Sequence, residues 1–429
     1  MATRTIRVEA LTRVEGEGAL ELDVNGDTIE AVRLAIFEPP RFFEALLRGR
    51  DGSEAPDITA RICGICPVAY QMSSVQAIED ALGITVDGQL RALRRLLYCG
   101  EWIESHALHI VLLHAPDFLG FPDAISMAQA HGDMVRRGLA LKKVGNDLLR
   151  LLGGREIHPV NVRVGGFYRT PGRAELAALV PALQEARESA VALARWVAGF
   201  AFPEFARDYL FVAMRDPGGY PLESGRIVSS DGLDIAAADY EAHFAERHMP
   251  HSTALHSVLH GAESYLVGPL ARFTLNFAQL GAPLQALCAE LGLAPGCRNP
   301  YRSIVVRAIE VAYACEEALR LIAAYVPPPA PAIAFARRAG TGMACTEAPR
   351  GLLYHRYQLA EDGSIVVAKI VPPTSQNQAI IEQDVLAVAA RDIALAEDVL
   401  RDHCEQAIRN YDPCISCSTH FLRLQVRRR

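Results

Sequence analysis

The sequence predicts a mainly α-helical protein with small β elements (an α+β fold), in which a core bundle of long helices lies beside an N-terminal antiparallel ribbon. Three observations predict it. Long stretches place apolar residues three or four positions apart, residues 5–36 alternate between apolar and polar side chains, and half of the 429 residues are hydrophobic. A chain of this length and composition buries a large core.

Hairpin signals define the predicted β elements. Asn25-Gly26-Asp27 divides the alternating stretch at residues 5–36, and its Asn-Gly step favours a tight two-residue turn. A second hairpin is predicted within residues 352–372, because Glu361-Asp362-Gly363 is typical of a turn. The chain therefore opens with one ribbon and carries another late in the sequence.

Five long helices are predicted, since five stretches keep the helical spacing of apolar residues over more than 20 positions. They cover residues 89–114, 123–152, 173–200, 301–325 and 381–411. Pro327-Pro328-Pro329 ends the fourth helix, and residues 215–231, which contain Gly and Pro, are predicted to be irregular. Repeats and low-complexity linkers are absent from the sequence, so we expect one domain.

Charge and hydropathy exclude several classes of protein. A net charge of -7 and a pI near 6.0 give no reason to expect nucleic acid, and Arg427-Arg428-Arg429 is too short to act as a basic arm. No uninterrupted apolar stretch approaches the about 18 residues of a membrane span. The N-terminus lacks an apolar signal core, so we do not expect export by a signal of its own, which permits the cytoplasmic location that we expect.

Two Cys-x-x-Cys pairs, Cys63/Cys66 and Cys414/Cys417, lie near opposite ends of the chain. Cysteines at this spacing can direct both sulfurs at one metal, and thiolates suit Zn, Ni, Cu(I) and Fe. The two pairs can form one site only if the fold joins the two ends of the chain. A structural zinc site usually places its pairs about 15–20 residues apart, and a thioredoxin-like redox pair would leave the other pair without a role.

The remaining cysteines show no pairing pattern, and most have apolar neighbours, so we expect reduced, buried thiols. They are Cys99, Cys288, Cys297, Cys315, Cys345 and Cys404.

The residues around the two pairs carry a resemblance. The first motif is Arg-Ile-Cys-Gly-Ile-Cys-Pro-Val-Ala-Tyr at residues 61–70, and the last is Asp-Pro-Cys-Ile-Ser-Cys-Ser-Thr-His at residues 412–420. Three more motifs follow family order: Thr12-Arg13-Val14-Glu15-Gly16, Arg41-Phe42-Phe43-Glu44 before Gly49-Arg50-Asp51, and Glu347-Ala348-Pro349-Arg350-Gly351. The chain resembles, over essentially its whole length, the large catalytic subunit of nickel-iron hydrogenases, and the resemblance implies that fold.

The resemblance implies a bimetallic centre held by all four cysteines of the pairs. Nickel would be bound by Cys63, Cys66, Cys414 and Cys417, with Cys66 and Cys417 bridging to an iron that carries CO and two cyanides. The substrate would be dihydrogen, whose heterolysis separates a hydride from a proton. A base near the thiolates is therefore required, and Glu15 matches the family glutamate that takes protons from a terminal cysteine, here Cys414.

Other site residues follow from the same motifs. Arg350 matches the arginine that overhangs the open face of the centre, and Pro349 beside it would, by the same resemblance, belong to the cofactor pocket. Thr374 is expected to donate a hydrogen bond to a cyanide, with Ser375 as the alternative. Without the resemblance, Glu15 would be interpreted as an exposed turn residue paired with Arg13, and Arg350 as part of a helix-end or interface ion pair.

A second metal is implied near the end of the chain. Glu44 and His420 match side-chain ligands of a magnesium (iron in some members), and a backbone carbonyl near Ile370 would be a third ligand. In this family a maturation endopeptidase cuts after the residue at the position of His420. We therefore predict one domain over residues 1–420 and a removable extension over residues 421–429; the alternative is a frayed tail without function.

Departures from the family pattern indicate a subgroup. Tyr70 and Glu17 stand where histidine is common in the family, and Ser105 stands where membrane-associated uptake enzymes have aspartate. Together these departures favour the cytoplasmic, bidirectional group linked to NAD(P), including sulfhydrogenases. Ser105 also brings a contact to Arg350 into question. His106 and His109 are spaced to bind a metal as a pair, but packing near a partner interface is favoured because no third ligand is evident.

Electron transfer implies partners. The motif cysteines are all used at the predicted centre, so an iron-sulfur small subunit would supply the relay. No Gly-x-Gly-x-x-Gly is present in a strand-turn-helix setting, so flavin and NAD(P) would bind further diaphorase subunits. Two other classes are weighed: a non-catalytic electron-transfer or quinone-site scaffold of the same fold, disfavoured by the retained thiolates, and a zinc-stapled interaction protein.

Overall fold

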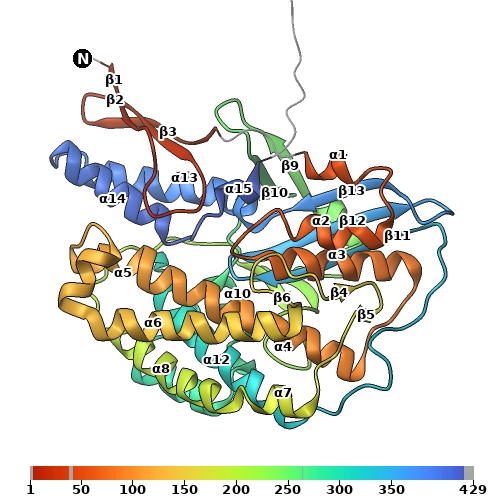
Figure 1. Ribbon diagram of the computed structural model, residues 1–429. Coiled ribbons are helices and arrows are strands. Elements are labelled where there is room, and N and C mark those ends of the chain that lie inside the picture. The colour runs from red at the N-terminus through yellow and green to blue at the C-terminus, as the bar shows by residue number, and fades with distance from the viewer. Residues whose placement is uncertain (1–2, 38–41, 263, 420–429) are drawn as a thin grey trace, which may run out of the picture.

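Four long helices pack together in one half of the molecule (Figure 1). They are α4 Gly88–Leu108, α6 Ala124–Gly153, α8 Val180–Ala198 and α12 Ser303–Ala323. In this computed structural model, which describes residues 3–37, 42–262 and 264–419, α4 contacts α6 and α12, and α8 contacts the same two helices. The predicted helix bundle is confirmed for four of the five predicted stretches, whereas the fifth, residues 381–411, packs outside it.

Two of the five predicted helices are divided. Residues 173–200 form α7 Arg173–Ala177 and then α8, because Pro181 has no amide hydrogen and is tolerated only in the first turn of a new helix. Residues 381–411 fall into α13 Pro373–Asp392 and α14 Glu397–Arg409. The start of α13 was missed because Thr374–Gln378 are polar and nevertheless buried, which hides the apolar spacing.

The predicted helix at residues 89–114 changes its winding near its end. The α-helical part stops at Leu108, and a π-helical turn continues over His109–His114. Such turns are often found at functional positions. Here the turn redirects two buried histidines, His109 and His114, toward the C-terminal part of the chain.

The main antiparallel sheet lies beside the bundle (Figure 1). It contains β11 Gly340–Ala348, β12 Gly351–Leu359 and β13 Ile365–Val371 in that order. The β12–β13 hairpin is the second ribbon predicted from the sequence, and Gly363 in its turn has a φ of +84° that favours glycine. Helix α3 Pro67–Leu82 packs on β11 and β12 and is almost wholly buried.

The N-terminal ribbon is confirmed as a three-stranded sheet. Its strands are β1 Thr3–Val8, β2 Gly18–Asn25 and β3 Thr28–Ile36, all antiparallel. Its last strand packs on α13. Because α13 precedes the C-terminal cysteine motif, this contact brings the two ends of the chain into one region.

Shorter elements complete the described part of the chain. The remaining helices are α1 Phe43–Leu47, α2 Ala55–Thr59, α5 Ala115–Leu119, α9 Tyr240–His243, α10 Pro269–Asn276, α11 Ala282–Glu290 and α15 Ile415–Ser418. The remaining strands are β4 Val162–Arg163, β5 Gly166–Phe167, β6 Val212–Arg215, β7 Arg226–Ser229, β8 Asp234–Ile235, β9 Phe244–His248 and β10 Leu255–Leu259. Among the helices in these described ranges, none is both long and apolar enough to cross a bilayer.

The prediction that residues 215–231 are irregular is wrong for β7. This strand is only four residues long and pairs with β6 on one side and β8 on the other. Ile227 and Val228 are buried there. So short a strand depends on its neighbours for register, which local sequence cannot reveal.

Helices α4 and α6 approach closely at a pair of glycines. A Cβ atom on Gly145 would lie 2.6 Å from the carbonyl oxygen of Gly100 and 2.7 Å from the backbone nitrogen of Glu104. Both neighbours are backbone atoms of α4 and cannot turn aside. The absence of a side chain at Gly145 therefore sets the distance between the two helices.

Substitution at this contact tests the packing. We expect Gly145→Ala to lower the free energy of unfolding by about 1–3 kcal/mol, because the helices must separate. The control is Gly132→Ala in the same helix, where the only near atom is the end of the flexible Arg136 side chain. It should be neutral or stabilising by up to about 1 kcal/mol. Denaturant unfolding of the two variants would contradict the argument if both lost the same stability.

Candidate metal centre

Four buried sulfurs meet where the ends of the chain converge. One ligand atom from each of Cys63, Cys66, Cys414 and Cys417 lies within 4.8 Å of the others. The sulfurs of Cys63 and Cys414 are 3.6 Å apart, and those of Cys414 and Cys417 are 2.7 Å apart. The condition that the fold must join the two pairs is met. We call these residues the four-cysteine site.

The first pair lies in the turn between α2 and α3. The backbone amides of Ile65 and Cys66 point at the Cys63 sulfur, at 3.3 and 3.2 Å. Pro67 then starts α3. The turn therefore presents its amides to a thiolate, an arrangement that stabilises negative charge on sulfur.

Glu101 of α4 holds the beginning of α3 in place. Its two carboxyl oxygens accept hydrogen bonds from the backbone amides of Val68 and Ala69, at 2.6 and 3.0 Å. These amides belong to the first turn of α3 and have no partner within the helix. Burial raises the pKa of Glu101 well above its usual value. The role of Glu101 was not predicted from the sequence, because a glutamate within a long helix carries no local signal of it.

The second pair lies at the start of α15. The backbones of Glu15 and Cys414 form a parallel bridge, and the amide of Ile415 donates to the Glu15 carbonyl at 2.9 Å. The amide of Cys414 donates to the Thr374 hydroxyl at 3.0 Å. The N-terminal motif and α13 thus hold the second pair against the first.

The donor set fits a cation that accepts soft ligands. Burial raises the pKa of the Cys414 and Cys417 thiols well above the usual value. Burial also opposes ionisation of Cys63, but hydrogen bonds from the neighbouring thiols lower its pKa well below the usual value. Burial therefore opposes negative charge on Cys414 and Cys417 in the absence of a metal, and a divalent ion bound there would displace their protons. Thiolate donors suit zinc and nickel alike.

Glu15 is half-buried, and its side chain reaches the second pair. The Cys414 thiol donates to Oε2 of Glu15 at 3.0 Å, and the Ser416 amide donates to the same oxygen at 3.1 Å. The alternative of a Glu15–Arg13 pair is not what the structure contains, because Arg13 forms an ion pair with Asp117. Glu15 is therefore positioned to exchange a proton with a cysteine sulfur.

Arg350 lies at the turn between β11 and β12 and is buried. Its Nε donates to the Asp412 carbonyl at 2.7 Å and its Nη2 donates to the Asp412 carboxylate at 3.0 Å. Burial opposes the charge, but Asp412 and the cysteine sulfurs raise the pKa of Arg350 well above its usual value. Within the described residues its Nη1 has no hydrogen-bond partner. Asp412 is the first residue of the C-terminal cysteine motif, but its role as the partner of Arg350 was not predicted.

Other predicted residues take distinct places. Thr374 accepts the Cys414 amide and keeps its own hydroxyl proton available, whereas Ser375 donates its proton to the Pro372 carbonyl at 2.8 Å. The carbonyl of Pro349 accepts a hydrogen bond from Arg272 at 2.9 Å. The geometry therefore favours Thr374 over Ser375 as a donor beside the cysteines.

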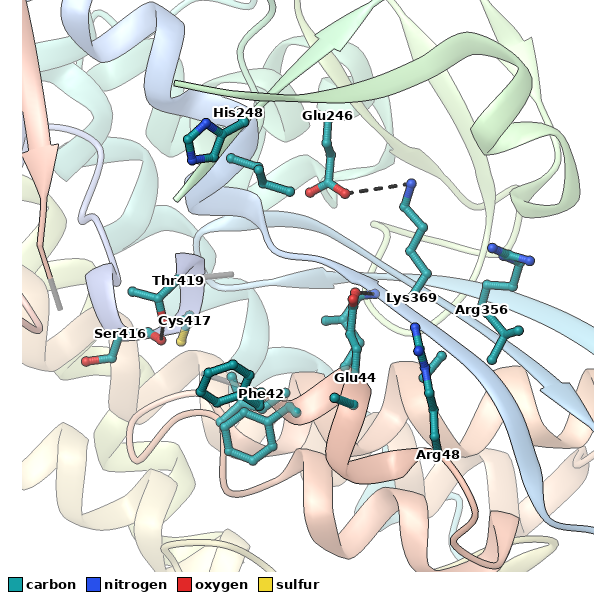
Figure 2. Close-up of a pocket in the computed structure, with 17 residues that line it drawn as sticks. Phe42, Glu44, Arg48, Glu246, His248, Arg356, Lys369, Ser416, Cys417 and Thr419 are labelled. Atoms are coloured by element: carbon teal, nitrogen blue, oxygen red, sulfur yellow. Dashed lines mark hydrogen bonds and ion pairs between the residues drawn. The ribbon is translucent and has the colours of Figure 1, made fainter. Parts of the chain in front are cut away.

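Glu44 and Ile370 are neighbours, as the second-metal prediction requires. The amide of Ile370 donates to Oε1 of Glu44 at 2.8 Å. His420 and residues 421–429 lie outside the described residues, so the histidine ligand and the removable extension remain predictions. A cavity of about 940 Å³ borders this place, with Cys417 and Thr419 on one side, Lys369 and Arg356 on the other, and Glu44 between them (Figure 2).

His106 and His109 do not converge as a metal pair. Nε2 of His106 lies 3.1 Å from Oε2 of Glu310, while Nε2 of His109 lies 2.9 Å from the Arg409 carbonyl. Both histidines are buried. Ser105 makes no hydrogen bond to Arg350 among the described residues, and its hydroxyl has no partner there. The other six cysteines form no disulfide; five are buried and Cys297 is half-buried.

Comparison with known proteins decides the family. The pattern that defines nickel-dependent hydrogenases matches residues 41–140. The chain is 35% identical over 422 residues to sulfhydrogenase 2 subunit alpha of Pyrococcus furiosus, covering 98% of this chain and 100% of that protein. It is 33% identical to sulfhydrogenase 1 subunit alpha of the same organism, covering 98% of each. The chain belongs to the nickel-dependent hydrogenase family.

A solved structure agrees with this assignment. The hydrogenase chain superposes on a chain of the NAD+-reducing [NiFe]-hydrogenase in the H2-reduced state with a TM-score of 0.89 and 26% identity, covering 98% of this chain and 100% of that chain. The predicted hydrogenase large-subunit fold and the predicted membership of the nickel-iron hydrogenase family are confirmed. The family is nickel-dependent, and the four buried thiols are a group that could hold a metal ion of this kind.

The support that Glu101 gives to α3 can be tested by substitution. Glu101→Ala leaves two buried amides without acceptors, which we expect to cost about 1–3 kcal/mol of unfolding free energy for each. We also expect lower nickel content, because the turn that carries the first pair is no longer held. Glu101→Gln retains one acceptor oxygen and should be intermediate. Exposed Glu188 on α8 provides the control, Glu188→Ala; nickel content equal in all three variants would contradict this role.

Proposed function

We propose that this hydrogenase chain is the catalytic subunit that cleaves dihydrogen reversibly into protons and electrons, with electrons passing through an iron-sulfur small subunit to NAD(P) or polysulfide. The observation that supports it most directly is the four-cysteine site with Glu15 hydrogen-bonded to one of its sulfurs. The names of the matching proteins, a sulfhydrogenase alpha subunit and an NAD+-reducing hydrogenase, support the two acceptors.

The cofactor fits the residues that would hold it. Cys63, Cys66, Cys414 and Cys417 would bind nickel, with Cys66 and Cys417 also binding an iron that carries CO and two cyanides. When bound, this group supplies the heterolytic cleavage of dihydrogen. The Thr374 hydroxyl oxygen accepts a hydrogen bond from the Cys414 amide, which places this hydroxyl beside Cys414. Its proton can therefore be donated to a ligand bound there.

The chain itself would move the proton. The Cys414 sulfur lies 3.0 Å from Oε2 of Glu15, a hydrogen-bond distance across which a proton on the sulfur could pass to the carboxylate. The Ser416 amide holds the same carboxyl oxygen in place. Arg350 remains charged beside the sulfurs and is itself fixed by Asp412, so it can orient a small ligand or water without changing its protonation.

The remaining parts of the proposal concern partners and maturation. Within the described residues, the only cysteine cluster is the four-cysteine site, so we assign the iron-sulfur relay to a separate subunit and flavin and NAD(P) binding to diaphorase subunits. Glu44, Ile370 and His420 would hold magnesium or iron. A maturation endopeptidase would cut after His420. A cytoplasmic location is part of this proposal, because the chain is similar to sulfhydrogenase alpha subunits and to an NAD-reducing hydrogenase subunit.

The decisive experiment is metal analysis with infrared spectroscopy. We expect protein co-purified with its partners, from a host with the nickel-iron maturation system, to contain nickel and iron in equal amounts at the four-cysteine site. Its infrared spectrum should show the stretching bands of CO and cyanide. The intact mass of the chain should correspond to a C-terminus at His420. Stoichiometric zinc with no such bands, while a control hydrogenase matures in the same host, would instead support a zinc-stapled protein. An active, metal-loaded chain that retains residues 421–429 would contradict only the processing step.

The proton role of Glu15 gives a separate prediction. Glu15→Gln keeps the size and an acceptor but cannot take a proton, so we expect hydrogen oxidation and hydrogen–deuterium exchange with water to fall by about 10²–10⁴-fold. Nickel content and the infrared bands should be unchanged. Glu17→Gln, at the exposed neighbouring glutamate, is the control and should remain near wild type. Wild-type exchange rates in Glu15→Gln would exclude this carboxyl as the proton acceptor.

A further inference from the structure

A second group of metal-ligating side chains lies outside the hydrogenase centre. His251 is in the loop between β9 and β10, His256 is on β10, and Glu382 is on α13. One ligand atom from each lies within 4.8 Å of the others. We call these three residues the His-His-Glu cluster. The function proposed above uses none of them.

The cluster is already organised by polar contacts. Nε2 of His251 lies 2.8 Å from Oε1 of Glu382, and the same oxygen accepts the backbone amide of Leu34 at 2.9 Å. The rings of His251 and His256 have centroids 5.9 Å apart and stand nearly perpendicular. Two imidazoles and a carboxylate thus converge from three separate elements.

His256 supplies an independent reason to look for a ligand. The residue is only 4% exposed, yet its Nε2 has no hydrogen-bond partner among the described residues. A buried polar atom without a partner costs free energy and calls for an explanation such as an ion. Burial lowers the pKa of His256, so the imidazole is neutral and can offer a lone pair to a metal.

The nearby arginines leave the Glu382 carboxylate available to bind a metal ion. Arg33, which lies near Glu382, forms its short ion pair with Asp23 at 2.6 Å. Arg247 lines the cavity beside the cluster but is exposed on β9. This cavity of about 320 Å³ also borders His256 and Glu382, so water can reach the cluster and complete a coordination shell.

We propose that His251, His256 and Glu382 bind a divalent transition-metal ion, with zinc as the best match, and that water fills the fourth position. Two histidines and a carboxylate are ordinary zinc ligands, whereas magnesium and calcium prefer oxygen donors alone. The proposal does not depend on the hydrogenase centre.

The ion would connect three parts of the fold near the end of the chain. The amide of Thr253, in the same loop, donates to the Ile36 carbonyl at the end of β3 at 2.8 Å. Ala254 forms an antiparallel bridge with Thr419, which is two residues beyond Cys417. A metal bound by His251, His256 and Glu382 would link the β9–β10 loop to α13. It would therefore hold in place the loop that pairs with Thr419.

Zinc titration of the holoenzyme tests the proposal. Holoenzyme is dialysed against a chelator under conditions that retain nickel and iron, and then titrated with zinc chloride. We expect one further zinc per chain. Zinc K-edge X-ray absorption, which is insensitive to nickel and iron, should show nitrogen and oxygen ligands at about 2.0–2.1 Å. Sulfur at about 2.3 Å, or no stoichiometric zinc, would overturn the proposal.

Variants locate the site and provide controls. His256→Ala, His251→Ala and Glu382→Gln should each weaken zinc binding by more than about 100-fold, since even residues that only support metal ligands contribute about 10–100-fold. Glu382→Gln can still accept the Leu34 amide, so its folding should be preserved. His260→Ala, at the exposed end of the same hairpin, should bind zinc like wild type.

The outcomes separate this inference from the proposed function. Wild-type zinc binding in the three cluster variants would overturn the His-His-Glu site while leaving the nickel-iron centre untouched. Histidine-bound zinc in a protein that lacks nickel would instead support this site and count against the hydrogenase proposal alone.

Discussion

The structure depends on the union of the two ends of the chain. The backbone bridge between Glu15 and Cys414, with the amide of Ile415 bound to the Glu15 carbonyl, connects positions separated by almost the whole chain. This one contact completes the four-cysteine site and also places a carboxyl group against a cysteine sulfur. Joining distant segments has a large entropic cost, so the contact must be supported by the packing of β3 on α13 and by the buried core around it.

Buried charge is the second constraint, and it is concentrated around the same region. Arg350 is compensated by Asp412, and the fully buried Arg272 by Glu310 and Glu347 at 2.9 Å each. Arg272 also binds the carbonyls of Ala348 and Pro349, so it secures the turn that presents Arg350. Such networks are costly to desolvate and are stable only when every charge is paired. The desolvation cost of these networks is consistent with a functional role, which is to hold the Arg350 guanidinium rigidly beside the cysteine sulfurs.

Much of the fold was predictable because it is locally encoded. The apolar spacing identified the bundle helices, and the turn signals identified both ribbons. The errors arose where tertiary contacts override local pattern. The four residues of β7 form a strand because β6 and β8 flank them. Helix α13 begins among buried polar residues whose hydrogen bonds are long-range; the Val267 amide, for example, donates to Oδ1 of Asn377 at 2.9 Å. Sequence periodicity assumes that buried residues are apolar, so it cannot find such a start.

The sequence by itself determined the chemistry of the centre: four thiols in two pairs, a nearby glutamate and an arginine, each within a recognisable motif. Only the tertiary structure decided how these groups meet. It assigned Asp412 to Arg350, Glu101 to the first turn of α3, and Thr374 rather than Ser375 to Cys414. It also brought together His251, His256 and Glu382, which share no motif. The physical reason is that covalent spacing fixes which ligands one turn can present, whereas long-range packing fixes which turns share a site.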